Sequence, residues 1–89
     1  MNKEYLQYDQ KATKVNLIKA MERSPYTTYG LHKVLNKALS EKEISLQAVY
    51  QWRNPNSSKV PSLANIVALS GILGVELTDI IAVKKEVKE

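Results

Sequence analysis

The clearest pattern in the chain is a stripe of apolar residues that follows Thr27. Its members stand at relative positions i, i+3, i+4, i+7 and i+8, the spacing of one face of an amphipathic helix; they are Leu31, Val34, Leu35, Ala38 and Leu39. Weaker helical patterns cover residues 11–23, 45–54 and 63–73, and a short fifth helix follows residue 78. The sequence therefore predicts five helices.

Residues that begin and end helices stand at the edges of these segments. The hydroxyl groups of Thr27, Ser45 and Ser62 are suited to accept a hydrogen bond from the open N–H groups of a first turn. Gly74 is a common helix stop. Because no segment alternates apolar and polar residues over more than a few positions, we expect an all-α fold. We interpret residues 1–9 as an N-terminal arm, 10–83 as one domain and 84–89 as a frayed tail.

Composition and charge narrow the function. The 89 residues fit one small domain, include no cysteine and carry a net charge of +4. Residues 1–60 hold ten Lys or Arg against five Asp or Glu, whereas residues 61–89 hold three against four. This distribution favours contact between the first two-thirds of the chain and a polyanion. No apolar run is long enough to span a bilayer, and the N-terminus does not resemble a signal peptide, so a cytoplasmic protein without membrane contact is expected.

Catalytic and metal-binding functions have little support in the sequence. His32 is the one histidine, which leaves no set of metal ligands. The chain also has no cysteine nucleophile and no glycine-rich phosphate loop. We therefore expect a protein that is not an enzyme and that uses no metal or cofactor.

The stretch "ISLQAVYQW", residues 44–52, predicts a helix with two different sides. Val49 and Trp52 fall on one side at about 100° per residue and are expected in the core. Gln47 and Gln51 fall on the other and share a face. An amide both donates and accepts, so such a face is suited to read adenine in the major groove. A merely solvated face is the alternative interpretation.

Three segments together resemble the Cro and phage-repressor (XRE-like) family of helix-turn-helix DNA-binding proteins. They are "PYTTYGLHKVL", "ISLQAVYQW" and "VPSLANIVALSGILGVELTDII", and the resemblance covers about residues 11–82. It implies a five-helix, lambda-repressor-like domain that places residues 45–54 in the major groove. The chain departs from the family in the connection before Ile44. This connection is longer by about eight residues than the turn of a typical helix-turn-helix, and it lacks the usual turn glycine. We therefore expect an elongated second helix or a longer loop there.

The resemblance implies a bacterial or phage-encoded transcriptional regulator, a repressor or Cro-like switch, that binds double-stranded DNA as a homodimer. The residues expected to contact bases are Leu46, Gln47, Ala48, Tyr50 and Gln51. The residues expected to contact the DNA backbone are Thr28, Arg53, Asn54, Ser57, Ser58 and Lys59. Candidates for the dimer surface are Ile81, Val83 and Val87.

Two alternatives remain open at this stage. The first is an antitoxin or anti-regulator whose main partner is another protein, with the segment 36–43 or the C-terminal tail as its working surface. The second is an architectural protein that assists recombination.

Overall fold

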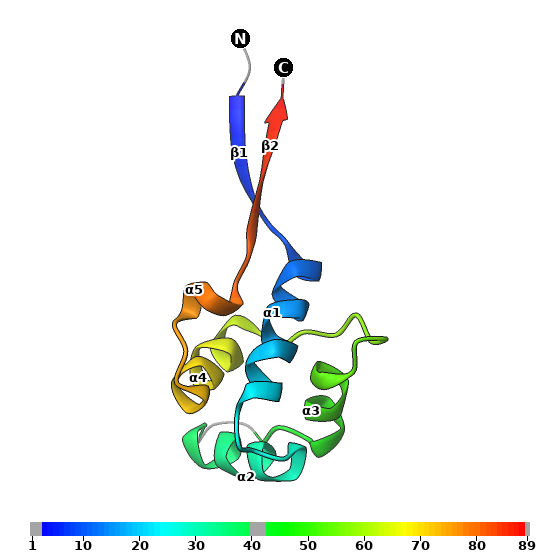
Figure 1. The fold of residues 1–89 in the computed structure, drawn as a ribbon, viewed down its shortest axis with the longest axis vertical. Helices are drawn as coiled ribbons and strands as arrows, with labels where there is room; N and C mark the ends of the chain where they lie inside the picture. Colours follow the sequence, from blue (N-terminus) through cyan, green and yellow to red (C-terminus); the bar gives the residue numbers. More distant parts are fainter. Residues whose placement is uncertain (1–2, 40–42, 89) are drawn as a thin grey trace.

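The helices form a body from which two paired strands project. The computed structural model describes residues 3–39 and 43–88, and its elements are β1 (Lys3–Tyr8), α1 (Gln10–Arg23), α2 (Thr28–Ala38), α3 (Leu46–Arg53), α4 (Leu63–Leu73), α5 (Leu77–Ile80) and β2 (Val83–Lys88). Figure 1 shows β1 and β2 as a ribbon that carries both ends of the chain to its tip, while α2 lies at the opposite end of the body. The molecule measures 51 × 27 × 21 Å, so it is elongated along the ribbon.

Local capping explains where three helices begin. The side-chain oxygens of Thr27, Ser45 and Ser62 each accept a hydrogen bond from the backbone N–H three residues further on, at 3.0, 3.1 and 3.3 Å. Each bond satisfies one of the N–H groups that a first turn leaves open. Gly74 follows α4 with a φ of 69°, the left-handed conformation that glycine adopts without strain. These four predicted helix boundaries are confirmed.

One core joins all five helices. Its buried apolar residues are Leu17, Met21, Leu31, Leu35, Val49, Trp52, Ile66, Leu69 and Ile80. Trp52 is 6% exposed and Val49 is fully buried, which confirms their predicted inward orientation. The helices predicted at residues 11–23 and 63–73 leave some apolar side chains outside the core, because Val15, Leu63 and Val67 are 50%, 63% and 50% exposed.

The expectation of an all-α fold is wrong, because β1 and β2 form a two-stranded antiparallel sheet. The register pairs Tyr8 with Val83 at the base and Lys3 with Lys88 near the tip. β1 lies in the predicted arm, residues 1–9, and β2 lies in the predicted frayed tail, residues 84–89, except that it begins at Val83 in the predicted domain. Each segment looks unstructured alone because its backbone partners lie at the other end of the chain, and a strand needs such a partner.

The base of the ribbon is fastened to the helical body. The N–H of Asp9 donates to the carbonyl of Ala82 at 2.9 Å, and the N–H of Ala82 donates to the hydroxyl of Thr13 at 2.9 Å. Asp9 also caps α1, because its carboxylate accepts a hydrogen bond from the N–H of Ala12 at 3.0 Å. The start of α1 and the start of β2 are thus held by the same short stretch of backbone.

The two elements that flank the long connection are described, whereas its middle, residues 40–42, lies outside the described residues. α2 continues through Ala38, and Leu39 ends it with an N–H bonded to the carbonyl of Leu35. The expected elongation of this connection is therefore described only at its two ends. Leu39 and Ile44, which stand on either side of this connection, are partly buried and pack against the core.

Candidate nucleic-acid interface

The outer face of α3 gathers the polar side chains expected to read bases. Gln47, Tyr50 and Gln51 line one shallow hollow, together with Arg53 and Asn54 from the end of the helix. Tyr50 is 55% exposed, and Gln47 is also exposed. Because Val49 and Trp52 fill the opposite side with buried apolar groups, this face is the one that α3 presents outward.

The other two residues expected to contact bases lie closer to the core. Leu46 is half-buried at the first position of α3. Ala48 is also half-buried and packs against the core cluster. Less of each side chain is therefore available to a DNA base than of Gln47 or Tyr50.

A hydrogen bond joins two residues expected to contact the DNA backbone. Nη1 of Arg53 donates to the hydroxyl of Thr28 at 3.0 Å, which links the end of α3 to the start of α2. A guanidinium carries five N–H donors, so this bond leaves capacity for a phosphate group. Thr28 stands in the first turn of α2, where the helix dipole favours an anion. The pair therefore places a cation and a helix N-terminus side by side.

The loop after α3 carries the remaining residues expected to contact the backbone. Asn54, Ser58 and Lys59 are exposed, whereas Ser57 is half-buried and its hydroxyl accepts a hydrogen bond from the N–H of Lys59 at 3.2 Å. The carbonyl of Ser58 accepts a hydrogen bond from the side chain of Gln10 at 2.8 Å. The loop is thus held against α1 through its backbone, and most of its polar side chains face outward.

Lys14 ties this loop and α3 to α1, and sequence reasoning missed it. Its Nζ donates to the carbonyls of Gln51 and Lys59, at 2.6 Å each, and the residue is 7% exposed. Burial lowers the pKa of the Lys14 ammonium below its usual value. The signal was present in the sequence, since Lys14 stands three and seven residues before the buried Leu17 and Met21, where an apolar residue is expected.

Hydrogen bonds from α2 hold the start of α3 in the absence of a turn glycine. The side-chain amide of Asn36 donates to the carbonyl of Ile44 at 3.0 Å and accepts a hydrogen bond from its N–H at 2.7 Å. Nε2 of His32 donates to the same carbonyl at 2.8 Å. His32 therefore has a structural role, and α2 and α3 are linked at both ends: here and through Arg53.

Charge around α3 is favourable to a polyanion. Residues 44–75 contain no Asp or Glu, and residues 10–75 contain nine Lys or Arg against three Asp or Glu. Exposed Tyr29 on α2 adds an aromatic surface, with Nζ of Lys33 at 5.7 Å from its ring centroid. Residues 10–75 are thus more basic than the whole chain, because six of the nine acidic residues stand before residue 10 or after residue 75.

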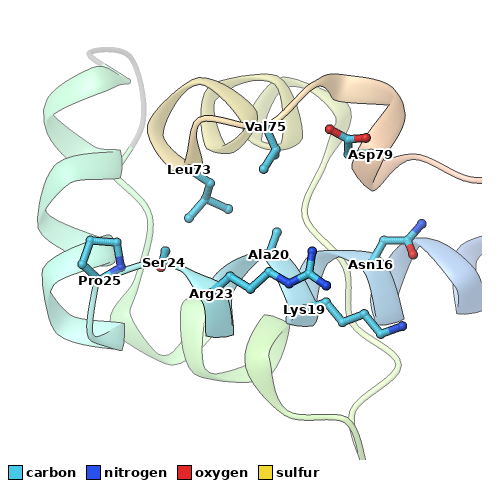
Figure 2. Close-up of a pocket in the computed structure, with 9 residues that line it drawn as sticks. All are labelled: Asn16, Lys19, Ala20, Arg23, Ser24, Pro25, Leu73, Val75 and Asp79. Atoms are coloured by element: carbon cyan, nitrogen blue, oxygen red, sulfur yellow. The ribbon is translucent and has the colours of Figure 1, made fainter.

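A second hollow, of about 420 Å³, separates α1 from the turn between α4 and α5. Figure 2 shows Lys19 and Arg23 on α1 and places Leu73 and Val75 across from this helix, while the side chain of Lys19 extends away from them. Its other polar side chains hold backbone groups: Asn16 donates to the carbonyl of Ile80 at 3.2 Å, and Asp79 accepts from the N–H of Glu76 at 2.9 Å. The lining offers no nucleophile with a neighbouring base, so this hollow is a weaker candidate site than the face of α3.

The function of the candidate site is inferred from its geometry, because comparisons with known proteins identify no relative. Among the described residues, no three His, Asp or Glu side chains gather as a metal-binding group. None of the described helices is long and apolar enough to cross a membrane. No protein-family model, curated protein or solved structure matches the chain significantly.

Proposed function

We propose that the chain is a sequence-specific DNA-binding transcriptional regulator of the Cro and phage-repressor type. The observation that carries this proposal is the two-sided α3. Its Val49 and Trp52 are buried, while Gln47, Tyr50 and Gln51 line one outward hollow. The major groove admits one α-helix, and a glutamine amide pairs bidentately with adenine there.

Contacts to phosphate would set the position of α3 in the groove. The linked Arg53 and Thr28 stand at one end of its outward face, and the exposed Ser58 and Lys59 follow in the next loop. Contacts of this kind fix the register of a protein on the duplex and supply affinity, whereas the glutamines supply sequence preference. Lys14 and Asn36 support the arrangement by holding both ends of α3 to neighbouring helices.

Selection from a random DNA library provides the primary test. We expect the chain to enrich one family of related sequences. On the enriched site, Gln47→Ala and Gln51→Ala should each weaken binding by about 1–3 kcal/mol, with little change on unrelated DNA. Fluorescence anisotropy measures both affinities, and circular dichroism checks that the variants are folded. Enrichment of no sequence, or full affinity of both variants for the enriched site, would contradict the proposal.

The salt dependence of binding separates phosphate contacts from general basicity. Lys59→Ala should weaken binding to all sequences alike and reduce the slope of log K against log salt by about one unit. Lys19→Ala is the matched control: it removes the same charge from an exposed position in the hollow beside α4 and α5. Its slope should stay unchanged. Equal slopes for the two variants, or an altered sequence preference of Lys59→Ala, would overturn the assigned role of Lys59.

A further inference from the structure

One face of the ribbon exposes apolar side chains. In an antiparallel pair, side chains of opposite residues share a face, and the register places Leu6, Tyr8 and Val83 on the same side. They are 69%, 49% and 59% exposed. We call this side the apolar face of the ribbon. Lys85 lies on it opposite Leu6, and Glu4 lies on it nearer the tip, with Nζ of Lys85 4.0 Å from Oε2 of Glu4.

The apolar face continues onto the helical body. The same three ribbon residues line a hollow of about 420 Å³ with Pro61 and Leu63 at the start of α4. Leu63 is 63% exposed although it begins a core helix. Exposed apolar residues scattered singly are ordinary, but a continuous patch marks a surface that another molecule covers.

The ribbon itself requires packing against another apolar surface. It has two strands of six residues each, about 20 Å long, and within the described chain no third strand pairs with either edge. Figure 1 shows that most of its length stands clear of the helices. An isolated two-stranded ribbon is at best marginally stable in water, and packing one face against apolar groups is what stabilises it.

We propose that the apolar face of the ribbon packs against the same face of a second copy of this chain. A two-fold axis parallel to the ribbon places β1 of one copy over β2 of the other. Tyr8 then meets Val83 of the second copy, and Glu4 comes near Lys85 of the second copy. Leu6, which pairs with Lys85 within the ribbon, lies over the apolar stem of Lys85 of the second copy.

This arrangement gives the DNA-binding surfaces a common direction. An axis along the ribbon sets the two helical bodies side by side, with both copies of α2 and α3 at the end away from the ribbon tip. A dimer that binds two half-sites of a palindrome needs this symmetry. The purpose of the pairing rests on the proposed function, whereas the pairing itself is measured without DNA.

Analytical ultracentrifugation without DNA, over about 1–500 µM, tests the contact in the range expected for a small interface. We expect a reversible monomer–dimer equilibrium for the unaltered chain. Leu6→Gln should raise the dimer dissociation constant at least about tenfold, because two copies of an apolar side chain leave the interface. Tyr5→Gln is the matched control, since Tyr5 is 45% exposed on the opposite face, and it should leave the constant unchanged.

A second pair of variants avoids any effect on strand pairing. Leu63→Gln lies in the hollow on α4 and should also weaken the dimer, whereas Val15→Gln, 50% exposed on α1 outside that hollow, should not. A monomer at all concentrations, or equal effects within either pair, would overturn the inference. A monomer that binds DNA would overturn this inference alone, and a dimer that binds no DNA would overturn the proposed function alone.

Discussion

Replacing Lys14 with methionine tests whether a buried ammonium group holds the end of α3 to α1. The substitution keeps an unbranched side chain and removes Nζ, together with its two 2.6 Å hydrogen bonds to the carbonyls of Gln51 and Lys59. Lys14 is only 7% exposed, so water replaces the lost donor poorly. We expect Lys14→Met to lower the free energy of unfolding.

The size of the loss follows from three terms. Two hydrogen bonds to a charged group contribute about 3–6 kcal/mol together, and the cost of burying the ammonium, several kcal/mol, offsets much of this. The carbonyl of Gln51 keeps the N–H of Asn54 as a partner at 3.3 Å. Among the described residues no second donor reaches the carbonyl of Lys59 to replace Nζ, and leaving this carbonyl without a partner costs about 1–3 kcal/mol. A net destabilisation of about 2 kcal/mol at pH 7 is expected.

The difference in the free energy of unfolding between the unaltered chain and Lys14→Met should also depend on pH. Burial lowers the pKa of Lys14 below its usual 10.5 in the folded chain. Between the folded value and 10.5 the unfolded chain binds more protons, so the free energy of unfolding rises with pH. Lys14→Met lacks this titration. The stability advantage of the unaltered chain should therefore be largest above pH 10.5 and decrease as pH falls through the folded pKa.

Urea denaturation of both proteins at pH 7 and pH 10 measures both effects, and comparing the two proteins at the same pH cancels the contributions that they share. Lys19→Met is the control, because Lys19 is exposed on the same helix; it should change stability by less than about 0.5 kcal/mol. If Lys14→Met is as stable as the unaltered chain at pH 7, the buried charge costs as much as its bonds contribute. The interpretation of Lys14 as a stabilising tie would then be wrong.

Three further substitutions probe the core, the α2–α3 connection and a helix end. Trp52→Ala should cost about 3–5 kcal/mol in urea denaturation because it leaves a cavity in the core, and a loss below 1 kcal/mol, about the cost of a surface change, would refute its burial. Asn36→Ala should cost about 1–3 kcal/mol because both bonds to Ile44 are lost, whereas the exposed neighbour Lys37→Ala should be neutral; equal melting temperatures would refute this role. Gly74→Ala should lower stability by about 1–2 kcal/mol because its φ is 69°, and an unchanged melting temperature would contradict the strain.

The helix boundaries were predictable because they depend on neighbours in the sequence. A hydroxyl at Thr27, Ser45 or Ser62 meets an N–H only three residues away, so a short window of sequence contains the whole interaction. The ribbon was missed for the opposite reason. Tyr8 and Val83 pair although 75 positions separate them in the sequence. Neither strand alternates apolar and polar residues clearly enough to be predicted as a strand.

The candidate site was predictable in part for the same reason. The helical phase alone separates Gln47 and Gln51 from Trp52, and the structure places them accordingly. The ties that hold α3 were not predictable, because Lys14 and Asn36 act on backbone carbonyls far along the chain. Every residue has a backbone carbonyl, so the sequence does not indicate which one a distant side chain will contact.

Pairing between the first and last strands has a consequence for synthesis of the chain. β1 leaves the ribosome early, but its partner β2 begins 75 residues after Tyr8. At ordinary rates of translation the first strand therefore waits roughly 4–15 s, while the helices between them have time to fold. During that interval its edge is open to any other extended peptide. The ribbon thus forms only after the helices between its two strands have been synthesised, and until then β1 can pair wrongly with an extended segment of another nascent chain.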